Sequence, residues 1–413
     1  YWFFEIRSLG GAIIMMSLVL YPYVYLMARA AFLEQSVSSI EVGCSLGYSR
    51  WQALWKLALP MARPAIIAGL SLALMETLAD YGTVQYYGVS TFTTGIFRTF
   101  YGYGDTAAAA QLAASLLAFV ILLVLLERYS RRRARYHSAA ESRARADLIP
   151  LSGSKAIMAC VICLSPLMFG FIIPATQLLF WAVFEAEPLG WDFVGLAWNS
   201  FSLAFLAAII AVILAIILSY AKRTKPIKPV RTVLAMAGFG YALPGTIIAI
   251  GVLIPLAWLD HRLIDIFGSL GWDSPGLLLS GSLVALLFAY TVRFLAVALG
   301  SVQSGLEKIK PSLDHVGRSM GHSPLDILRK IHVPLMRSSI LTAVLIVFVD
   351  VLKELPATLI LRPFNFNTMA VRAYELASDE RLVDAAPASI MIVLVGLIPV
   401  LMLHASIARR RPH

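Results

Sequence analysis

Long, continuously apolar stretches recur along this chain, and they constrain its fold more than any other feature. A helix needs about 20 apolar residues to cross the roughly 30 Å hydrocarbon core of a membrane. Nine such runs can be delimited: 9–33, 61–86, 107–127, 155–184, 199–221, 230–258, 278–300, 335–360 and 384–408. They are too long and too uniformly apolar for the alternating strands of a membrane β-barrel. The sequence therefore predicts an all-α integral membrane protein, a polytopic helical bundle of about nine spans.

Composition excludes the main soluble classes. Hydrophobic residues make up 59% of the 413 residues and charged residues 14%, against roughly 45–50% and about 25% in soluble domains. A soluble protein this apolar would expose patches large enough to aggregate, so a cytoplasmic enzyme and a disordered scaffold are excluded. Cys160 and Cys163 form a C-x-x-C within an apolar run, with no second pair to complete a metal site. We therefore expect packed thiols and no metal centre.

The net charge of +10 marks orientation, and no nucleic-acid partner is expected. Basic residues gather in the segments 128–155 and 222–231 and in the tail 409–411. If nine spans alternate in direction, all three places fall on one side of the membrane, opposite loops that are rich in acids. Loops with an excess of Lys and Arg face the cytoplasm. We therefore expect the basic loops and the C-terminus to be cytoplasmic.

The chain contains an internal repeat, a common feature of transporters. A shift of 274 residues superposes matching positions: Gly47 on Gly321, Pro60 on Pro334, Glu76 on Asp350 and Asp80 on Glu354. Both copies begin on the same side, so the repeat is parallel. The second copy has three further spans upstream that the first copy lacks. We infer a parent of two six-span halves, twelve helices in all, whose first three are absent from this chain.

The repeat divides the sequence into two halves. Residues 1–135 form the first half, with its last three spans and a cytoplasmic loop at 34–60. Residues 136–154 form a basic cytoplasmic linker. Residues 155–413 form the second half, with six spans and a cytoplasmic loop at 301–334.

The two long cytoplasmic loops share one pattern. In each, nine residues separate a glycine from a four-residue segment that begins with an aliphatic residue and ends in proline: Leu57-Ala58-Leu59-Pro60 follows Gly47, and Ile331-His332-Val333-Pro334 follows Gly321. The segments 49–58 and 323–332 predict short amphipathic helices, with Ser49 and Ser323 as N-caps and Pro324 at the first helical position. Glycine and proline often punctuate loops at membrane ends, but two copies with identical spacing indicate a shared function.

This pattern resembles the EAA loop of binding-protein-dependent ABC importer permeases: E-A-A, three residues, G, nine residues, I-x-L-P. The resemblance implies that each loop forms a coupling helix, which docks on a cytoplasmic ATPase. The matching positions are Glu41, Gly47, Leu57 and Pro60 in the first loop, and Gly321, Ile331 and Pro334 in the second. Both loops depart from the family at its first positions: Glu41-Val42-Gly43 replaces E-A-A, and His315-Val316-Gly317 lacks the Glu.

The stretches 75–84, 353–363 and 373–381 resemble the fused, two-half permeases of ferric-iron importers. That resemblance implies a bacterial inner-membrane permease that receives iron from a periplasmic binding protein and works with a cytoplasmic ATPase homodimer. The chain has no G-x-x-x-x-G-K-[ST] phosphate-binding loop. ATP and Mg²⁺ are therefore expected on the ATPase, with no cofactor and no catalytic residue in this chain. Related fused permeases carry thiamine or phosphonates, which remain alternative cargoes.

Two other classes of membrane protein explain the sequence less completely. An ion-coupled secondary transporter would explain the repeat but not the two matched cytoplasmic loops. A membrane-embedded enzyme would need a His, Asp or Glu constellation within the spans, and the sequence shows none.

Four acidic residues in the spans are candidates for the transport pathway: Glu76, Asp80, Asp350 and Glu354. A carboxylate at the bilayer centre costs about 2.5–3.5 kcal/mol, so two related helices with the same carboxylates are not expected to face lipid. One reading is structural, with hydrogen bonds between helices or a pair with Lys353. The other places Glu76 and Asp350 along the outer part of the pore, where their oxygens would suit a hard cation.

Overall fold

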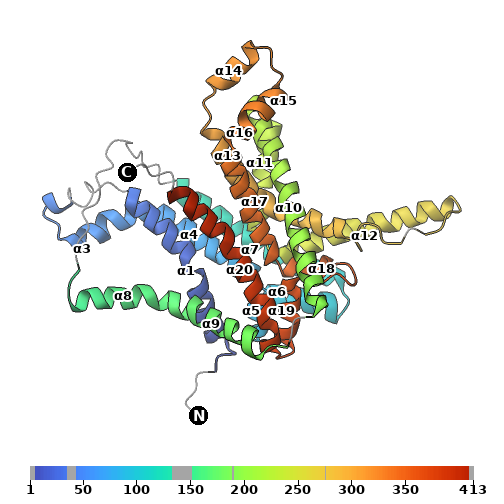
Figure 1. Cartoon of the computed structure of the whole chain (residues 1–413), viewed down its shortest axis with the longest axis horizontal. Coiled ribbons are helices and arrows are strands. Elements are labelled where there is room, and N and C mark those ends of the chain that lie inside the picture. The colour runs from blue at the N-terminus through green and yellow to red at the C-terminus, as the bar shows by residue number, and fades with distance from the viewer. Residues whose placement is uncertain (1–4, 35–42, 133–150, 188–189, 275, 409–413) are drawn as a thin grey trace. The chain divides into compact units, whose positions relative to one another are not determined.

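The computed structural model describes residues 5–34, 43–132, 151–187, 190–274 and 276–408, which form helices and connecting turns but no strand (Figure 1). A bilayer core offers no water to backbone N–H and C=O groups, so a spanning segment must satisfy them internally. An α-helix does this along continuously apolar sequence. The predicted all-α membrane fold is confirmed.

The first part of the chain forms the following elements: α1 (Leu9–Glu34), α3 (Arg50–Ala53), η1 (Leu54–Ala58), α4 (Leu59–Ala79), α5 (Gly82–Tyr86), α6 (Phe92–Phe97), η2 (Arg98–Gly102) and α7 (Thr106–Arg132). After the predicted linker come α8 (Ser154–Leu167), η3 (Met168–Ile172), α9 (Ile173–Phe180), η4 (Trp181–Glu185), α10 (Trp191–Thr224), α11 (Lys228–Ala237), η5 (Gly240–Ala242) and α12 (Gly245–Ser269). The last part forms α13 (Leu283–Glu307), α14 (Ser312–Ser319), α15 (Pro324–Ile327), η6 (Leu328–His332), α16 (Val333–Leu335), α17 (Arg337–Leu352), α18 (Pro356–Leu361), α19 (Met369–Ser378) and α20 (Leu382–Ala408).

Seven helical stretches among the described residues are long and apolar enough to cross a membrane. An eighth is reached if Pro324–Leu335 and Arg337–Leu352, which are bent by 77° relative to each other, count as one span. The last predicted run forms α20, in which Leu382–Ile398 is a shorter apolar helix among the described residues. The structure therefore places a helix on every predicted run, although several boundaries differ from the prediction.

The predicted run 230–258 is wrong as a single span. Its first part is the separate helix α11, and the long helix α12 begins only at Gly245 and continues to Ser269. The break lies where Gly240 touches the backbone of α13: a Cβ on Gly240 would lie 1.9 Å from the carbonyl oxygen of Val292. Only a glycine permits this approach.

Two further runs end earlier than predicted. The helix from 61 ends at Ala79, where Asp80 takes an extended conformation, and α5 follows. Its counterpart α17 ends at Leu352, and α18 starts at Pro356. Proline lacks an N–H and is suited to the first turn of a helix, so it begins a new segment here.

Contacts divide the chain into two compact units. The first unit comprises Tyr1–Gly95 and Ala114–Gln177, and in it α1 packs along α4. A Cβ on Gly69 of α4 would lie 2.8 Å from the carbonyl oxygen of Tyr23, so the two helices approach closely through this glycine. Small residues allow such close packing in membranes.

The second unit comprises Ile96–Ala113 and Leu178–His413. Its centre is formed by α10, α13 and α17, which pack against one another. Within this unit, α14 and α15 lie at one end of α10, whereas α18 and α19 lie toward the other end (Figure 1). The predicted halves 1–135 and 155–413 describe the repeat along the sequence and stay a prediction.

Candidate functional site: the coupling loops and the acidic residues of the spans

The second predicted coupling loop consists of two short helical segments joined by a glycine turn. After α14, Gly321 has φ +79°, a left-handed conformation that costs a residue with a Cβ about 1–2 kcal/mol. Ser323 then caps the next segment, because its Oγ accepts a hydrogen bond from the N–H of Asp326 at 3.2 Å. Pro324 occupies the first turn of α15, and η6 continues to His332. The predicted helix at 323–332 and its cap are confirmed.

The first predicted coupling loop has the same backbone plan. Gly47 has φ +88°, and α3 and η1 form the predicted helix up to Ala58. The Oγ of Ser49 accepts a hydrogen bond from the N–H of Gln52 at 3.3 Å, and the Oε1 of Gln52 accepts one from the N–H of Ser49 at 3.1 Å. This reciprocal arrangement is a capping box. Glu41 lies outside the described residues.

A second pair of glycines, Gly43 and Gly317, lets the two segments of each loop pack closely. A Cβ on Gly43 would lie 2.8 Å from Cδ1 of Leu57, and a Cβ on Gly317 would lie 2.9 Å from Cγ1 of Ile327. Ile331, the counterpart of Leu57, has its Cδ1 3.5 Å from the same point on Gly317. A larger residue at either glycine must displace these side chains. The pattern of the sequence had singled out Leu57 and Ile331 but not the glycines they contact.

Both short helices end in a wider helical turn, η1 and η6, at positions related by the repeat. Such turns often occur at functional sites. Pro60 and Pro334 then occupy the first turn of the helices that follow, α4 and α16.

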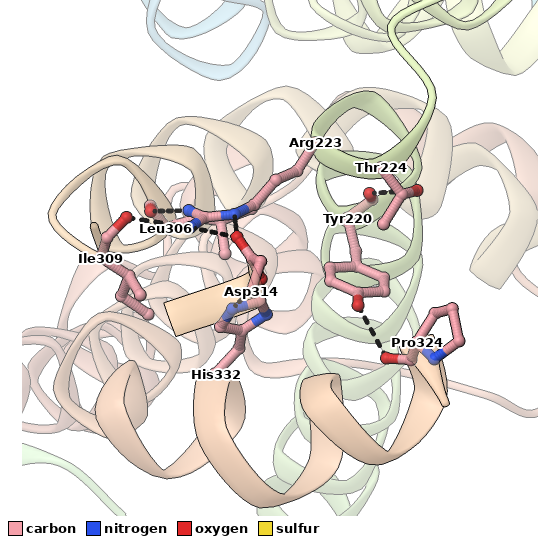
Figure 2. Close-up of polar contacts among 8 residues, drawn as sticks. All are labelled: Tyr220, Arg223, Thr224, Leu306, Ile309, Asp314, Pro324 and His332. Carbon is pink, nitrogen blue, oxygen red and sulfur yellow. Dashed lines mark hydrogen bonds and ion pairs between the residues drawn. The ribbon is translucent and has the colours of Figure 1, made fainter. Parts of the chain in front are cut away.

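A charged cluster ties the second loop to the end of α10 (Figure 2). Nε of Arg223 donates to Oδ2 of Asp314 at 2.8 Å, Nη1 donates to the carbonyl oxygen of Leu306 at 2.6 Å, and Nη2 donates to that of Ile309 at 2.9 Å. The rigid fork of an arginine suits several acceptors at once. One side chain of α10 thus contacts the end of α13, the following turn and α14.

His332 completes this cluster from the side of η6. Its Nε2 lies 2.8 Å from Oδ1 of Asp314, and its buried ring meets the ring of Tyr220 edge to face at 5.4 Å. Burial lowers the pKa of His332 below its usual value; the Asp314 carboxylate raises it in part, and the Arg223 guanidinium lowers it. The hydroxyl of Tyr220 donates to the carbonyl oxygen of Pro324 at 2.7 Å.

Sequence reasoning missed this cluster. The leading carboxylate of the family pattern falls on His315, so the pattern assigns no carboxylate to the second loop. The structure shows that Asp314, one residue earlier, lies inside the loop and binds Arg223 and His332. The available signal was a carboxylate next to the expected position, together with an arginine in the last turn of a long apolar helix.

The four acidic pathway candidates have different surroundings. Glu76 lies within α4, and we find no hydrogen-bond or ion-pair partner for it among the described residues. Asp80 lies beyond the helix end instead of inside the span, and it accepts hydrogen bonds from the hydroxyl of Thr83 at 3.0 Å and the N–H of Val84 at 3.1 Å. Asp350 is buried in α17 and pairs with Nζ of Lys353 at 3.0 Å.

Glu354 forms a buried ion pair that the sequence did not predict. It also lies beyond its span, between α17 and α18, and its Oε1 is 2.9 Å from Nη1 of Arg293 on α13. The N–H of Ala357 donates to the same oxygen at 3.2 Å. A Cβ on Gly245 would lie 2.3 Å from both charged groups, so the start of α12 closes over the pair. Asp80 and Glu354 therefore both hold the chain where a span ends.

A cavity of about 700 Å³ opens at the end of α10 that is remote from Arg223. It lies between the first turns of α10 and the helices α19 and α20, with Asp192, Asn199, Arg372, Arg381 and Asp384 among its lining residues. Arg381 pairs with Asp384 at 2.7 Å. The wall therefore offers charges of both signs.

Comparisons with known proteins agree with this architecture. Residues 4–136 match the family described as "Binding-protein-dependent transport system inner membrane component". The Fe(3+)-transport system permease protein FbpB 2 of Haemophilus influenzae is 26% identical over 405 residues, which cover 97% of this chain and 77% of the relative.

Two other relatives extend the comparison. The ferric transport system permease protein FbpB of Actinobacillus pleuropneumoniae is 22% identical over 94% of this chain and 57% of its own length. The putative 2-aminoethylphosphonate transport system permease protein PhnV of Salmonella typhimurium is 24% identical over 49% of this chain and 72% of its own length. With its apolar helices, the chain is a multi-pass membrane protein that resembles the inner-membrane permease subunits of binding-protein-dependent ABC importers, and among them the permeases of ferric-iron systems.

Proposed function

We propose that this chain is the permease of an ATP-driven importer, which receives ferric iron from a periplasmic binding protein and passes it to the cytoplasm. The observation that carries the proposal is the repeated coupling loop, in a chain whose likeness to a ferric-iron permease extends over 97% of its length. Each loop has a glycine with positive φ, a serine-capped helix and a wide helical turn at matched positions. An ion-coupled transporter would have no use for two such loops.

The loops dock on the partner ATPase. In this proposal the contact is made by Gly47, Leu57 and Pro60 in the first loop and by Gly321, Ile331 and Pro334 in the second, with Glu41 preceding the first. A homodimer of ATPase subunits would offer one cleft to each loop, and it would hold ATP and Mg²⁺. The basic loops and the C-terminus then face the cytoplasm, in accord with their excess of Lys and Arg.

The acidic residues have separate roles in this proposal. Glu76 and Asp350 line the outer part of the pathway, where single carboxylates bind a hard cation weakly enough for it to leave. Asp80 and Glu354 hold the ends of the two related spans at the edge of that pathway. The hydrogen bonds of Asp80 and the ion pair of Glu354 support this division.

Reconstitution tests the proposal. The chain is placed in proteoliposomes with its ATPase and binding protein, and uptake of radioactive ferric iron is measured together with ATP hydrolysis. We expect Glu76→Gln with Asp350→Asn to lower iron uptake while hydrolysis stimulated by the loaded binding protein survives. Unchanged uptake at matched protein levels would remove both residues from the pathway.

The cargo needs a separate test, because relatives named for 2-aminoethylphosphonate transport match half of this chain. Competition of labelled iron uptake by 2-aminoethylphosphonate, with the binding protein present, distinguishes the two. We expect no competition. Uptake of labelled phosphonate in place of iron would assign the alternative cargo.

A further inference from the structure

Helix α10 is long enough to connect the cytoplasmic loop with the outer cavity. Its 34 residues, Trp191–Thr224, extend about 50 Å at 1.5 Å per residue, more than the roughly 30 Å core of a bilayer. Small residues at helical spacing, among them Ala204, Ala208, Ala211 and Ala215, are buried along it. They bring α13 and α17 close to its side, as small residues do between membrane helices.

At its cytoplasmic end, α10 holds the second coupling loop at several points. Arg223 contacts Asp314 and two backbone carbonyls, and Tyr220, one turn earlier, bonds the carbonyl oxygen of Pro324 (Figure 2). Asp314 in turn binds His332 at the end of η6. The side chains of Arg223 and Asp314 are only 16% and 12% exposed, so water competes little for these bonds.

At its outer end, α10 is bonded to the wall of the cavity. The Oγ of Ser200 accepts a hydrogen bond from the N–H of Met369 at 2.8 Å, at the start of α19. The amide of Asn199, which lines the cavity, donates to the carbonyl oxygen of Asn367 at 3.4 Å. Asn199 and Ser200 thus connect α10 to the start of α19 and to the residues just before it. A displacement of α10 along its axis would therefore change the position of the cavity wall that α10 forms.

We propose that Arg223 is a positioning residue that clamps the second coupling loop to α10, so that movement of this loop is transmitted along α10 to the outer cavity. This inference rests on the proposed function, in which the ATPase moves the loop. It assigns to one loop a direct connection to the opposite side of the membrane. In the first loop the position of His332 is occupied by Ala58, which has no polar side chain.

The test removes the clamp without touching the residues proposed to dock. Arg223→Gln loses the charge and the fork, and Arg223→Lys keeps the charge alone. Lys222→Gln is the matched control, because Lys222 is the exposed neighbour on the same turn. Each variant is purified with its ATPase and binding protein and placed in proteoliposomes. The amount of bound ATPase, the stimulated rate of ATP hydrolysis and the uptake of iron are each measured.

We expect Arg223→Gln to bind the normal amount of ATPase, while stimulation by the loaded binding protein and iron uptake both fall about tenfold or more. Arg223→Lys should retain part of both, and Lys222→Gln should retain all. Loss of ATPase binding in Arg223→Gln would overturn the proposal, because Arg223 would then serve docking. Normal stimulation and uptake in Arg223→Gln would overturn it as well.

A spectroscopic measurement separates transmission from a loss of folding. A spin label at Trp198→Cys, an exposed position near the outer end of α10, is introduced after Cys44, Cys160 and Cys163 are replaced by Ser. ATP should change the label's spectrum in the control Lys222→Gln, which keeps Arg223 and its contacts, but not in Arg223→Gln, at equal thermal stability. A wild-type chain that neither binds nor stimulates the ATPase would refute the proposed function itself. A normal spectral response to ATP in Arg223→Gln would refute only the clamp.

Discussion

Residues 43–60 and 317–334 are copies of one loop with the same backbone plan. They differ in the angle between the short helix and the span that follows it. In the first copy the short helix continues into α4 as one stretch, Trp51–Ala79. In the second copy Pro324–Leu335 and Arg337–Leu352 are bent by 77°. The bend lies at Met336, which is buried, where the first copy has Ala62.

The side chains of the two loops differ more than their backbones. The first loop exposes Trp51 and Trp55, at 71% and 64%. Leu325 stands in the place of Trp51 and is 53% exposed, whereas the second loop buries His332 against α10. Both copies keep the positive-φ glycine of the turn and the serine cap of the short helix. The exposed side chains and the contacts with neighbouring helices differ between the two copies.

The ends of the related spans show the same divergence. Asp80 and Glu354 both accept a backbone N–H from the short helix that follows. Glu354 in addition pairs with Arg293, whose repeat-related position is Val19. A shared local role is thus combined with a long-range contact in one copy.

The largest difference in stability between the two copies should appear when Asp80 and Glu354 are each replaced by alanine. Glu354→Ala leaves Arg293 buried without its carboxylate, and breaking a buried pair costs about 3–5 kcal/mol. Asp80→Ala should cost about 1 kcal/mol, as for the loss of a helix cap. The measurement is loss of helical circular dichroism during titration with a denaturing detergent. The double variant Arg293→Met with Glu354→Met should recover most of the stability, and equal losses in the two single variants would contradict the comparison.

Replacing the turn glycines should affect both loops alike. Gly47→Ala and Gly321→Ala each place a Cβ at positive φ, at a cost of about 1–2 kcal/mol. Hydrogen exchange of the loop amides should show faster opening in each variant. The control is Gly251→Ala in α12, where no atom lies within 4 Å of the new Cβ and where alanine favours the helix by about 1 kcal/mol. A response in only one loop would show that the backbones are not equivalent.

Substitutions of the cap residues should have slightly different effects in the two loops. Ser49→Ala and Ser323→Ala should each increase opening of the short helix by about 1 kcal/mol, the usual value of an N-cap. Gln52→Ala should affect the first loop alone, by less than the serine substitution, because Gln52 completes a capping box there. Hydrogen exchange resolved by loop distinguishes the two effects, and no change at 49–58 would argue against the capping box.

The smallest effect on stability is expected at the exposed tryptophans. Trp51→Ala with Trp55→Ala should change the free energy of unfolding by less than about 0.5 kcal/mol, as is usual for surface substitutions. Buried aromatic anchors contribute more than about 1 kcal/mol each at interfaces, so ATPase binding should weaken at least fivefold per tryptophan. Leu325→Ala should weaken it less. Binding at wild-type strength in the double variant would place the docking surface elsewhere on the loop.

Local properties of the sequence were sufficient for much of this structure. The spans follow from the length of apolar runs, because a bilayer favours helices wherever about 20 apolar residues are consecutive. The two loops follow from glycine, serine and proline at repeated spacing, since these residues set the turn, the cap and the helix start by their own conformational preferences. These predictions required no knowledge of distant contacts.

Helix boundaries depended on distant contacts and were predicted less well. The break in the run 230–258 occurs where Gly240 approaches Val292 on another helix. Asp80 and Glu354 were expected inside spans, because apolar residues continue beyond them in the sequence. Their hydrogen bonds to the next short helix decided otherwise.

The sequence by itself determined a helical membrane protein with two related loops, and only the tertiary structure decided which residues hold those loops in place. Arg223 and Asp314 are 91 positions apart, and Lys222 shares the last turn of α10 with Arg223, so position along the sequence does not select the residue that makes the contact. Their contact exists because α10 ends beside α14. Apolar run length is a property of neighbouring residues, whereas a charged contact depends on where two helices end in space.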